Sequence, residues 1–327
     1  MNISADQIFS IKDEATFNEV ALTVFRHQVK NCDTYKAFVN HLNLDIKSVD
    51  HFSEIPFLPI SFFKSHKILS TSTKPEIIFS SSGTTGQITS KHLVSDLSVY
   101  EKSYNKAFEQ FYGKAADICI LALLPSYLER DGSSLIYMVD DLLKQSNHPQ
   151  SGYFLYDLAQ LHETLSSLKA AKLKTVLIGV TYALLDFVEQ FQIDFPELIV
   201  METGGMKGKR KEMVREELHE TLCKGFGVEN IHSEYGMTEL LSQAYSYGKG
   251  IFNCPPWMKI LLRDTSDPLS LIKGKQSGGI NVIDLANFNS CSFIATQDLG
   301  KTYSDGSFEV LGRFDNADIR GCNLLVQ

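Results

Sequence analysis

Apolar positions recur at helical spacing through residues 1–50. Ala15, Leu22 and Val29 fall on one face of a helix, and Phe38 extends the pattern, so this stretch predicts helices. The segment 55–60 (IPFLPI) contains two prolines. Because proline disfavours a regular helix, this segment predicts an extended connector.

Beyond the connector, short β-prone runs alternate with amphipathic stretches. We predict strands over residues 76–79, 117–124, 152–155, 175–179, 198–202 and 230–233. We predict helices over residues 96–111, 134–143, 159–171, 182–191 and 211–223. Strands that alternate with helices at this rhythm indicate an α/β fold with a parallel sheet and crossover helices.

The character of the sequence changes after Pro255. Short β-rich runs follow over residues 259–263, 278–284, 292–296 and 307–311, with Gly, Asp and Asn between them. This pattern predicts a smaller β-rich subdomain packed on the α/β body. We therefore expect three parts: a helical N-terminal region over 1–50, an α/β core over 51–253, and a β-rich subdomain with a C-terminal tail over 254–327.

The composition is that of a soluble globular protein, with 43% hydrophobic residues among 327 and a net charge of −8. Net negative charge without a long basic block argues against nucleic acid or an anionic membrane surface as partner. The short basic cluster 207–211 fits either a solvated start of a helix or an anion site. No apolar run approaches the roughly 18–20 residues of a membrane span. Since the N-terminus also lacks the pattern of a signal peptide, we expect a cytoplasmic protein.

The six cysteines are scattered along the chain and form no CxxC pair. We therefore expect free thiols and neither a zinc site nor a disulfide framework.

A glycine- and hydroxyl-rich loop follows the predicted strand 76–79. Its sequence is Ser81-Ser82-Gly83-Thr84-Thr85-Gly86. Gly83 and Gly86 let the backbone approach an anion closely, and the N–H groups and hydroxyls can surround phosphate oxygens. It is not a Walker loop, because no Gly-Lys-Ser/Thr follows at the required spacing. An exposed polar turn explains the composition equally well.

Four motifs together resemble the adenylate-forming superfamily of acyl-CoA synthetases, peptide-synthetase adenylation domains and luciferases. The loop 81–86 is similar to its signature loop, and 235–239 (YGMTE) to its aromatic-Gly-x-Thr-Glu motif. Residues 298–300 (DLG) are similar to a later Gly-Asp-Leu motif, although Gln297 replaces the usual glycine. Residues 312–315 (GRFD) match its Gly-Arg-x-Asp motif.

Within that superfamily, the chain most resembles the acyl-protein synthetase family, the fatty-acid ligase of bacterial luminescence operons and its relatives. Three segments carry this finer resemblance: 55–64 (IPFLPISFFK), 254–259 (CPPWMK) and 319–325 (IRGCNLL). The resemblance therefore covers nearly the whole chain. It implies the large N-terminal domain of that superfamily, with parallel sheets, crossover helices and a distorted β-barrel.

The resemblance also implies ATP and Mg²⁺ at one site. In the superfamily, the loop holds the β- and γ-phosphates through its hydroxyls, which here belong to Ser81, Ser82, Thr84 and Thr85. The Thr of the second motif contacts the α-phosphate and its Glu helps to bind Mg²⁺. These residues correspond to Thr238 and Glu239, and a carboxylate with phosphates suits a hard divalent cation.

The adenosine would contact the remaining motif residues. The resemblance implies that Tyr235 stacks on adenine, that Gly204 and Gly205 form the wall beside it, and that Asp298 and Arg313 bind the ribose hydroxyls. Each residue has an ordinary structural alternative. Tyr235 fits a core position, Asp298 fits a turn cap, and Arg313 fits a surface ion pair.

The chain departs from the superfamily pattern after the fourth motif. Most members continue into a small C-terminal domain whose lysine pairs with the reacting carboxylate and the α-phosphate, whereas this sequence stops at Gln327. We expect another cation to stabilise that charge. Lys207 is the candidate, and a solvated lysine in a basic run is the alternative.

A cysteine near the C-terminus is the second point of interest. In the acyl-protein synthetase family the activated acyl group passes to such a cysteine of the enzyme itself, and Cys322 stands at the matching place. A thiolate is a strong nucleophile, although Cys322 also fits a buried position in an apolar tail. A reductase, an acyltransferase or a carrier protein would take the acyl group onward.

Two other functions remain open. One is a ligase that delivers a fatty or aryl acid to coenzyme A or to a carrier-protein thiol. The other is a non-catalytic nucleotide- or acyl-binding protein. The sequence does not identify the acid.

Overall fold

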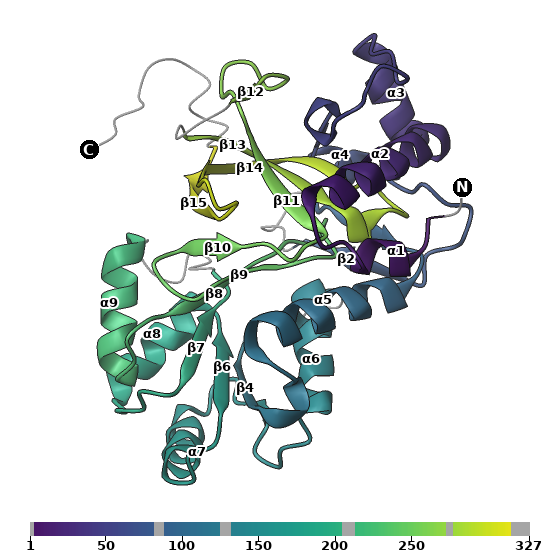
Figure 1. Cartoon of the computed structure of the whole chain (residues 1–327). Coiled ribbons are helices and arrows are strands. Elements are labelled where there is room, and N and C mark those ends of the chain that lie inside the picture. Colours follow the sequence, from purple (N-terminus) through teal and green to yellow (C-terminus); the bar gives the residue numbers. More distant parts are fainter. Residues whose placement is uncertain (1–2, 82–87, 125–131, 205–212, 273–276, 315–327) are drawn as a thin grey trace.

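The computed structural model describes residues 3–81, 88–124, 132–204, 213–272 and 277–314 (Figure 1). The helices are α1 Ala5–Phe9, α2 Glu14–Asn31, α3 Asp33–His41, α4 Phe62–Ser65, α5 Leu97–Tyr112, α6 Ser134–Ser146, α7 Leu158–Ala170, α8 Thr181–Gln190 and α9 Arg215–Phe226. The strands are β1 Leu58–Pro59, β2 Ile77–Ser80, β3 Lys91–Val94, β4 Cys119–Leu123, β5 Gly152–Tyr153, β6 Thr175–Gly179, β7 Ile199–Glu202, β8 His232–Tyr235, β9 Ala244–Ser246, β10 Ile251–Asn253, β11 Met258–Arg263, β12 Leu271–Ile272, β13 Ser277–Asp284, β14 Phe293–Thr302 and β15 Phe308–Arg313.

The middle of the chain forms the predicted parallel sheet. Strands β5, β4, β6, β7 and β8 lie side by side in that order, and each neighbouring pair is parallel. Every residue of β4 and β6 is buried, as expected for strands covered on both faces. Helices α8 and α9 lie on one side of these strands, and α5 and α6 lie on the other (Figure 1). The α/β prediction is therefore confirmed.

The β-rich C-terminal part continues the same sheet. Strand β8 pairs antiparallel with β9, and the order then runs through β10, β15, β14, β13 and β11 to β12. Strand β14 extends beyond the predicted run 292–296, and its pairing with β15 shifts register between Leu299 and Gly300. Gly300 leaves no room for a side chain at this shift, because a Cβ there would stand 2.7 Å from the carbonyl oxygen of Glu309. The division of the chain at residue 254 stays a prediction.

The N-terminal helices pack on this β-rich part. Asp13 caps α2 by accepting a hydrogen bond from the Thr16 N–H at 2.8 Å. In the middle of α2, the fully buried Gln28 amide donates to the carbonyl oxygens of Asn287 and Phe288, at 3.1 and 3.2 Å. Its own carbonyl accepts from the Ser292 N–H at 3.0 Å. Helix α2 is thus tied to the connection between β13 and β14.

A separate hairpin precedes α5. Strands β2 and β3 pair antiparallel, with Ser80 opposite Lys91, and they form a small sheet of their own. The sequence pattern predicted β2 but not β3. The glycine- and hydroxyl-rich loop lies between these two strands in the sequence, so the hairpin places the residues that precede and follow it.

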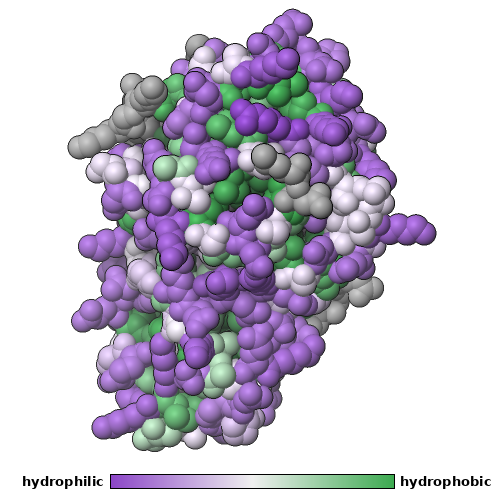
Figure 2. All heavy atoms as spheres, turned by 45° about the vertical axis from the view of Figure 1, so that its right-hand side comes forward, coloured by the Kyte–Doolittle hydropathy of each residue, from purple (hydrophilic) through white to green (hydrophobic). Residues whose placement is uncertain are grey.

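One face of the molecule is covered mostly by hydrophilic side chains, with hydrophobic ones in separate patches (Figure 2). Among the described residues, no helix has the length and apolar character needed to cross a membrane.

A buried carboxylate holds the segment between β8 and β9. Asp284 is fully buried at the end of β13 and accepts hydrogen bonds from the backbone N–H groups of Leu241, Ser242 and Ala286, at 2.7, 3.0 and 3.2 Å. It also accepts from the hydroxyl of Ser242 at 2.5 Å. These bonds replace the strand pairing that the segment 237–243 lacks.

We predict that Asp284→Ala lowers the free energy of unfolding by about 3 kcal/mol, because it leaves buried N–H donors without an acceptor. Urea denaturation of the purified variant measures the change. Asp117→Ala, at an exposed position, is the control and should change it by less than about 0.5 kcal/mol. Equal stability of the two variants would contradict the anchoring role.

Candidate active site

A cavity of about 660 Å³ lies at the carboxyl ends of β7 and β8. Ligand sites in α/β sheets form at this edge. Its lining residues come from α4, the base of the hairpin, α5 and α6, the ends of β7 and β8, the segment after β8, and β14 and β15. They are Ile60, Lys64, Ser80, Ser81, Ile88, Thr89, Ser90, Tyr100, Ser133, Ser134, Leu135, Met138, Thr203, Glu234, Gly236, Met237, Thr238, Glu239, Gln243, Gln297 and Arg313.

The described residues on either side of the hydroxyl-rich loop line this cavity: Ser81 before it, and Ile88, Thr89 and Ser90 after it. The Ser81 N–H donates to the carbonyl oxygen of Ser90 at 3.1 Å, and the Ser90 N–H donates to the Ser81 hydroxyl at 2.9 Å. Ser82, Gly83, Thr84, Thr85 and Gly86 lie outside the described residues. The base of the loop is therefore placed at the cavity, while the phosphate-holding role of its hydroxyls stays a prediction.

The Thr238–Glu239 segment is held by side chains from two other parts of the chain. A ring nitrogen of His92, on β3, lies 2.8 Å from the carbonyl oxygen of Thr238. The other ring nitrogen lies 2.9 Å from the carbonyl oxygen of the Asn287 side chain. The Asn287 amide nitrogen then donates to the carbonyl oxygen of Glu239 at 2.8 Å. His92 and Asn287 thus fix the backbone of the two motif residues that line the cavity.

Glu239 is the buried carboxyl of this segment, with 5% of its surface exposed. Burial raises its pKa, and a hydrogen bond with Ser90 and the charges of Arg313 and Lys64 oppose that rise. Lys64 reaches the cavity from α4, within the proline-containing connector segment. Lys64 and Arg313 are the cationic side chains among the described lining residues.

Tyr235, Asp298 and Arg313 form one chain of contacts. The Tyr235 hydroxyl donates to Asp298 at 2.8 Å, and the Arg313 Nε donates to the other carboxylate oxygen at 3.1 Å. Asp298 is 6% exposed and lies within β14, so it does not cap a turn. The Tyr235 ring is buried against Phe252 and Phe308. The described lining of the cavity does not include Tyr235, and its stacking on adenine stays a prediction.

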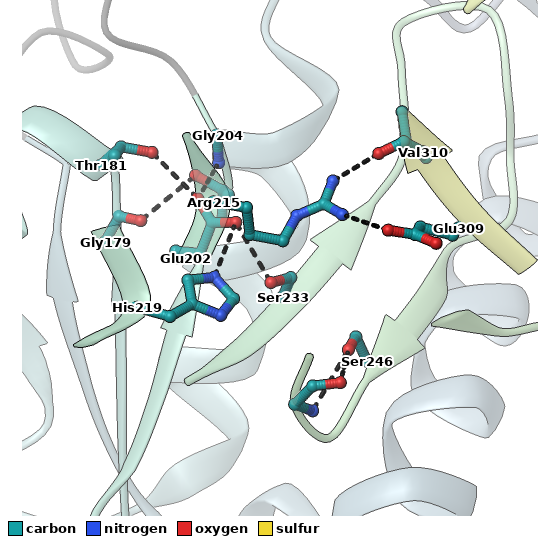
Figure 3. A network of polar contacts seen from close by, with 12 residues as sticks. Gly179, Thr181, Glu202, Gly204, Arg215, His219, Ser233, Ser246, Glu309 and Val310 are labelled. Carbon is teal, nitrogen blue, oxygen red and sulfur yellow. Dashed lines mark hydrogen bonds and ion pairs between the residues drawn. The ribbon is translucent and has the colours of Figure 1, made fainter. Parts of the chain in front are cut away.

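The turn after β7 is organised around Glu202 (Figure 3). Glu202 accepts hydrogen bonds from the Thr181 hydroxyl at 2.9 Å, the Gly204 N–H at 3.1 Å and the Ser233 hydroxyl at 3.1 Å. Burial alone raises the pKa of Glu202, but bonding by His219, Thr181 and Ser233 leaves it below the ordinary value. Nε2 of His219 lies 3.8 Å away, which suits an ion pair better than a hydrogen bond.

Gly204 adopts a φ of +74° at this turn, a conformation that favours glycine. Among the described residues, its chain neighbours aside, no heavy atom lies within 4 Å of the position that a Cβ on Gly204 would take. The role of Gly204 as a wall of the nucleotide site stays a prediction. Gly205 and Lys207 lie outside the described residues, and so does Cys322.

A magnesium ion fits this site as one shared between protein and phosphates. No group of three His, Cys, Asp or Glu side chains able to hold a metal ion occurs among the described residues. Mg²⁺ commonly takes only one or two protein carboxylates and completes its shell with phosphates and water. Glu239, buried at the cavity, is a suitable single ligand.

Several polar cavity residues were not predicted from the sequence, and Lys64, Glu234 and Gln243 are three of them. None of these three residues belongs to one of the four motifs, and Lys64 lies far from Glu234 and Gln243 in the sequence. Lys64 lies within the segment 55–64 that carried the family resemblance, and Glu234 directly precedes the YGMTE motif. The sequence signal for Lys64 and Glu234 was therefore that each lies in or next to a segment that carried the family resemblance.

The chain matches one protein family over nearly its full length. The family described as "Acyl-protein synthetase, LuxE" matches residues 3–327. A search of curated proteins finds no match.

Several solved structures share this fold. An open conformation of 2-hydroxyisobutyryl-CoA ligase in complex with 2-HIB-AMP and CoA has a TM-score of 0.67 at 10% identity, over 93% of this chain and 70% of that chain. ATP-bound MatB from Rhodopseudomonas palustris has a TM-score of 0.54 at 15% identity, over 81% of this chain and 49% of that chain. An ATP-bound RpMatB-BxBclM chimera has a TM-score of 0.54 at 16% identity, over 72% of this chain and 47% of that chain. The chain thus spans about half the length of the MatB chains.

The burial of His92 generates a testable pH dependence. Burial lowers its pKa from 6.5 to about 4, more than its two hydrogen bonds raise it. Between these values the unfolded chain binds a proton that the folded chain does not. The stability that the neutral His92 contributes is therefore fully present above about pH 6.5 and is lost as the pH falls toward 4.

We predict that His92→Gln removes about 2 kcal/mol of the difference between the free energies of unfolding at pH 7 and pH 5. Urea titrations at both pH values measure it, without nucleotide or metal. Burial also lowers the pKa of His232 to about 4, so a residual pH dependence is expected. His66→Gln, at an exposed position, is the control. The same pH dependence in His92→Gln and the unsubstituted protein would contradict the prediction.

Proposed function

The chain belongs to the acyl-protein synthetase family, and on that premise we propose that it activates a carboxylic acid with ATP as an acyl-adenylate and passes the acyl group to a thiol. One observation carries this proposal. The buried Thr238–Glu239 segment, the base of the hydroxyl-rich loop and Arg313 all face the same cavity. These residues come from three of the four motifs that carry the resemblance to adenylate-forming enzymes.

In the first step, a carboxylate oxygen of the acid attacks the α-phosphorus of ATP. The bond from that phosphorus to the bridging oxygen breaks, and its electron pair leaves with pyrophosphate. Thr238 is proposed to donate to the α-phosphate, and Glu239 to hold Mg²⁺, which neutralises charge on the phosphates. Lys64 adds positive charge on the same side of the cavity, since its charge reaches Glu239. Lys207 stays the candidate predicted from the sequence.

The adenosine is assigned to the turn after β7 and to β14 and β15. Gly204 offers an open backbone surface for the base. Asp298 accepts from Tyr235 and Arg313, and this pairing fixes the side chains to which we assign the ribose.

In the second step, a thiolate sulfur attacks the acyl carbon, the bond to the AMP oxygen breaks, and AMP leaves. We propose Cys322 as this thiol and a fatty acid as the substrate, both by family resemblance. A reductase, an acyltransferase or a carrier protein would then take the acyl group.

A second candidate is a ligase that uses coenzyme A as the thiol. The structural likeness to 2-hydroxyisobutyryl-CoA ligase, solved in complex with CoA, favours it. In that case Cys322 would not carry the acyl group.

We predict that Glu239→Ala lowers acid-dependent pyrophosphate–ATP exchange by about 100-fold or more, because the substitution removes the proposed metal ligand. Radioactive exchange over a panel of fatty and aromatic acids measures the activity. Glu239→Gln keeps the volume and removes the charge, and it should be similarly impaired.

Glu220→Ala, on the exposed surface of α9, is the matched control and should retain full exchange. Exchange by Glu239→Ala at the control rate would disprove the role of Glu239. Absence of exchange in the unsubstituted protein with every acid would disprove the proposed function.

We predict that Cys322→Ala retains exchange but no longer becomes labelled by radioactive acid plus ATP, because the acceptor thiol is gone. Acid-stable, hydroxylamine-sensitive label on the denatured protein measures the thioester. Cys223→Ala, at a half-buried free cysteine, is the control and should label normally. Persistent labelling of Cys322→Ala would exclude it as the acceptor, and thioester formation on added coenzyme A by that variant would favour the second candidate.

A further inference from the structure

Strands β8 and β9 place three polar side chains on one face of the sheet. Glu234 on β8 stands directly opposite Tyr245 on β9. Gln243 precedes β9 and, two residues before Tyr245, falls on the same face. Glu234 and Gln243 both line the cavity. This face of the sheet is the one toward α5, because the ring centroids of Tyr112 on α5 and Tyr245 lie 5.3 Å apart.

Gln243 has unused hydrogen-bonding capacity inside the cavity wall. It is 4% exposed, and its side-chain carbonyl oxygen is buried without a hydrogen-bond partner. The Tyr245 hydroxyl is likewise buried without a partner. A buried polar atom left unpaired destabilises the folded protein, so a partner supplied by a ligand is favoured.

Glu234 lies beside Gln243. A Cβ on Gly236 would stand 2.3 Å from a carboxyl oxygen of Glu234 and 3.3 Å from Cγ of Gln243. Both side chains therefore pass over the same glycine, and any larger residue there would collide with them. Among the described residues, the side chain of Glu234 has no hydrogen-bond partner.

Part of the remaining lining is apolar. Leu135 and Met138 of α6 face the cavity, together with Tyr100 of α5. The Tyr100 hydroxyl donates to the carbonyl oxygen of Ser134 at 2.9 Å, which holds the ring next to the start of α6. This lining suits the carbon skeleton of an acyl group, while Glu234 and Gln243 suit a polar substituent on it.

We infer that Glu234 and Gln243 form a polar subsite that selects an acid bearing a hydroxyl group. The inference rests on the proposed function, because it assigns this end of the cavity to the acyl group. A hydroxyl can donate to the Gln243 carbonyl oxygen and bond Glu234 at the same time. An unsubstituted alkyl chain laid over these two side chains would bury them without partners, which disfavours it.

The charge of Glu234 argues for a hydroxyl rather than an ammonium group. Burial, and then the charge of Glu202, raises the pKa of Glu234 to about 8. At neutral pH the carboxyl is therefore mostly protonated and acts as both donor and acceptor. A neutral carboxyl pairs with a hydroxyl, whereas an ammonium group would require the ionised form.

The test uses stable acyl sulfamates of adenosine, which mimic the acyl-adenylate, with isothermal calorimetry on the full chain. Each short- or medium-chain acyl group is compared with its 3-hydroxy, ω-hydroxy and ω-amino derivatives. We expect one hydroxylated compound to bind about 10-fold or more tightly than its unsubstituted partner, since one good hydrogen bond is worth about 1.4 kcal/mol. In Gln243→Leu this preference should be lost, because an apolar side chain replaces the acceptor.

Two further variants sharpen the result. Gln160→Leu makes the same chemical change on the exposed surface of α7 and should keep the preference. Glu234→Gln, whose amide also donates and accepts, should keep it as well.

The outcomes are distinct. Equal affinity for hydroxylated and unsubstituted compounds, a preference unchanged in Gln243→Leu, or tighter binding of the amino derivative would each overturn the inference. If no acyl sulfamate binds, while the urea transition of the protein is normal, the proposed function itself fails.

Discussion

The backbone between β8 and β9 is the constraint on which the rest of the site depends. The residues Thr238 to Ser242 belong to no helix or strand, so side chains from elsewhere must satisfy their backbone groups. His92 and Asn287 lie against the carbonyl oxygens of Thr238 and Glu239, and Asp284 accepts from the N–H groups of Leu241 and Ser242. Asp284 ends β13 and caps the short 3-10 helix Leu285–Asn287, whose last residue is Asn287. The β-rich part therefore positions residues that the parallel sheet carries to the cavity.

Four carboxyl groups around this region, two buried and two half-buried, have different surroundings. Asp284 is surrounded by donors, yet burial still raises its pKa to about 6. Glu202 gains enough from its donors that its pKa falls below the ordinary value. Glu239 has hydrogen bonds with Ser90 and with its own backbone N–H, together with the charges of Arg313 and Lys64. Glu234 has no such donors, and its pKa rises furthest above the ordinary value. The two carboxyl groups that line the cavity are thus the least satisfied, as expected where a ligand completes the site.

The pattern of apolar and polar residues predicted helices and strands well where buried positions recur at the period of the helix or strand. The strand 175–179 has the predicted bounds, because Thr175–Gly179 is buried throughout and reads as one apolar run. Strand β3 was missed, since Lys91–Val94 is short and mixes polar with apolar residues. Motifs led to Thr238, Glu239 and Arg313 at the cavity. They did not lead to Gln243 or Lys64, whose places depend on strand pairing and on a connector that crosses the fold. Pairing between distant segments is not encoded in any local period.

Alternation along β8 explains how one strand serves two purposes. Ser233 and Tyr235 point to one face, where they donate to Glu202 and to Asp298. These contacts organise the turn at Gly204 and the pair Asp298–Arg313, both assigned to the nucleotide. His232 and Glu234 point to the other face, toward α5, where His232 lies 3.4 Å from the Tyr112 hydroxyl and Glu234 reaches the cavity. Because successive side chains of a strand alternate between faces, a shift of one residue in β8 would exchange both sets. The register of β8 against β7 and β9 therefore fixes the nucleotide side and the acyl side of the site together.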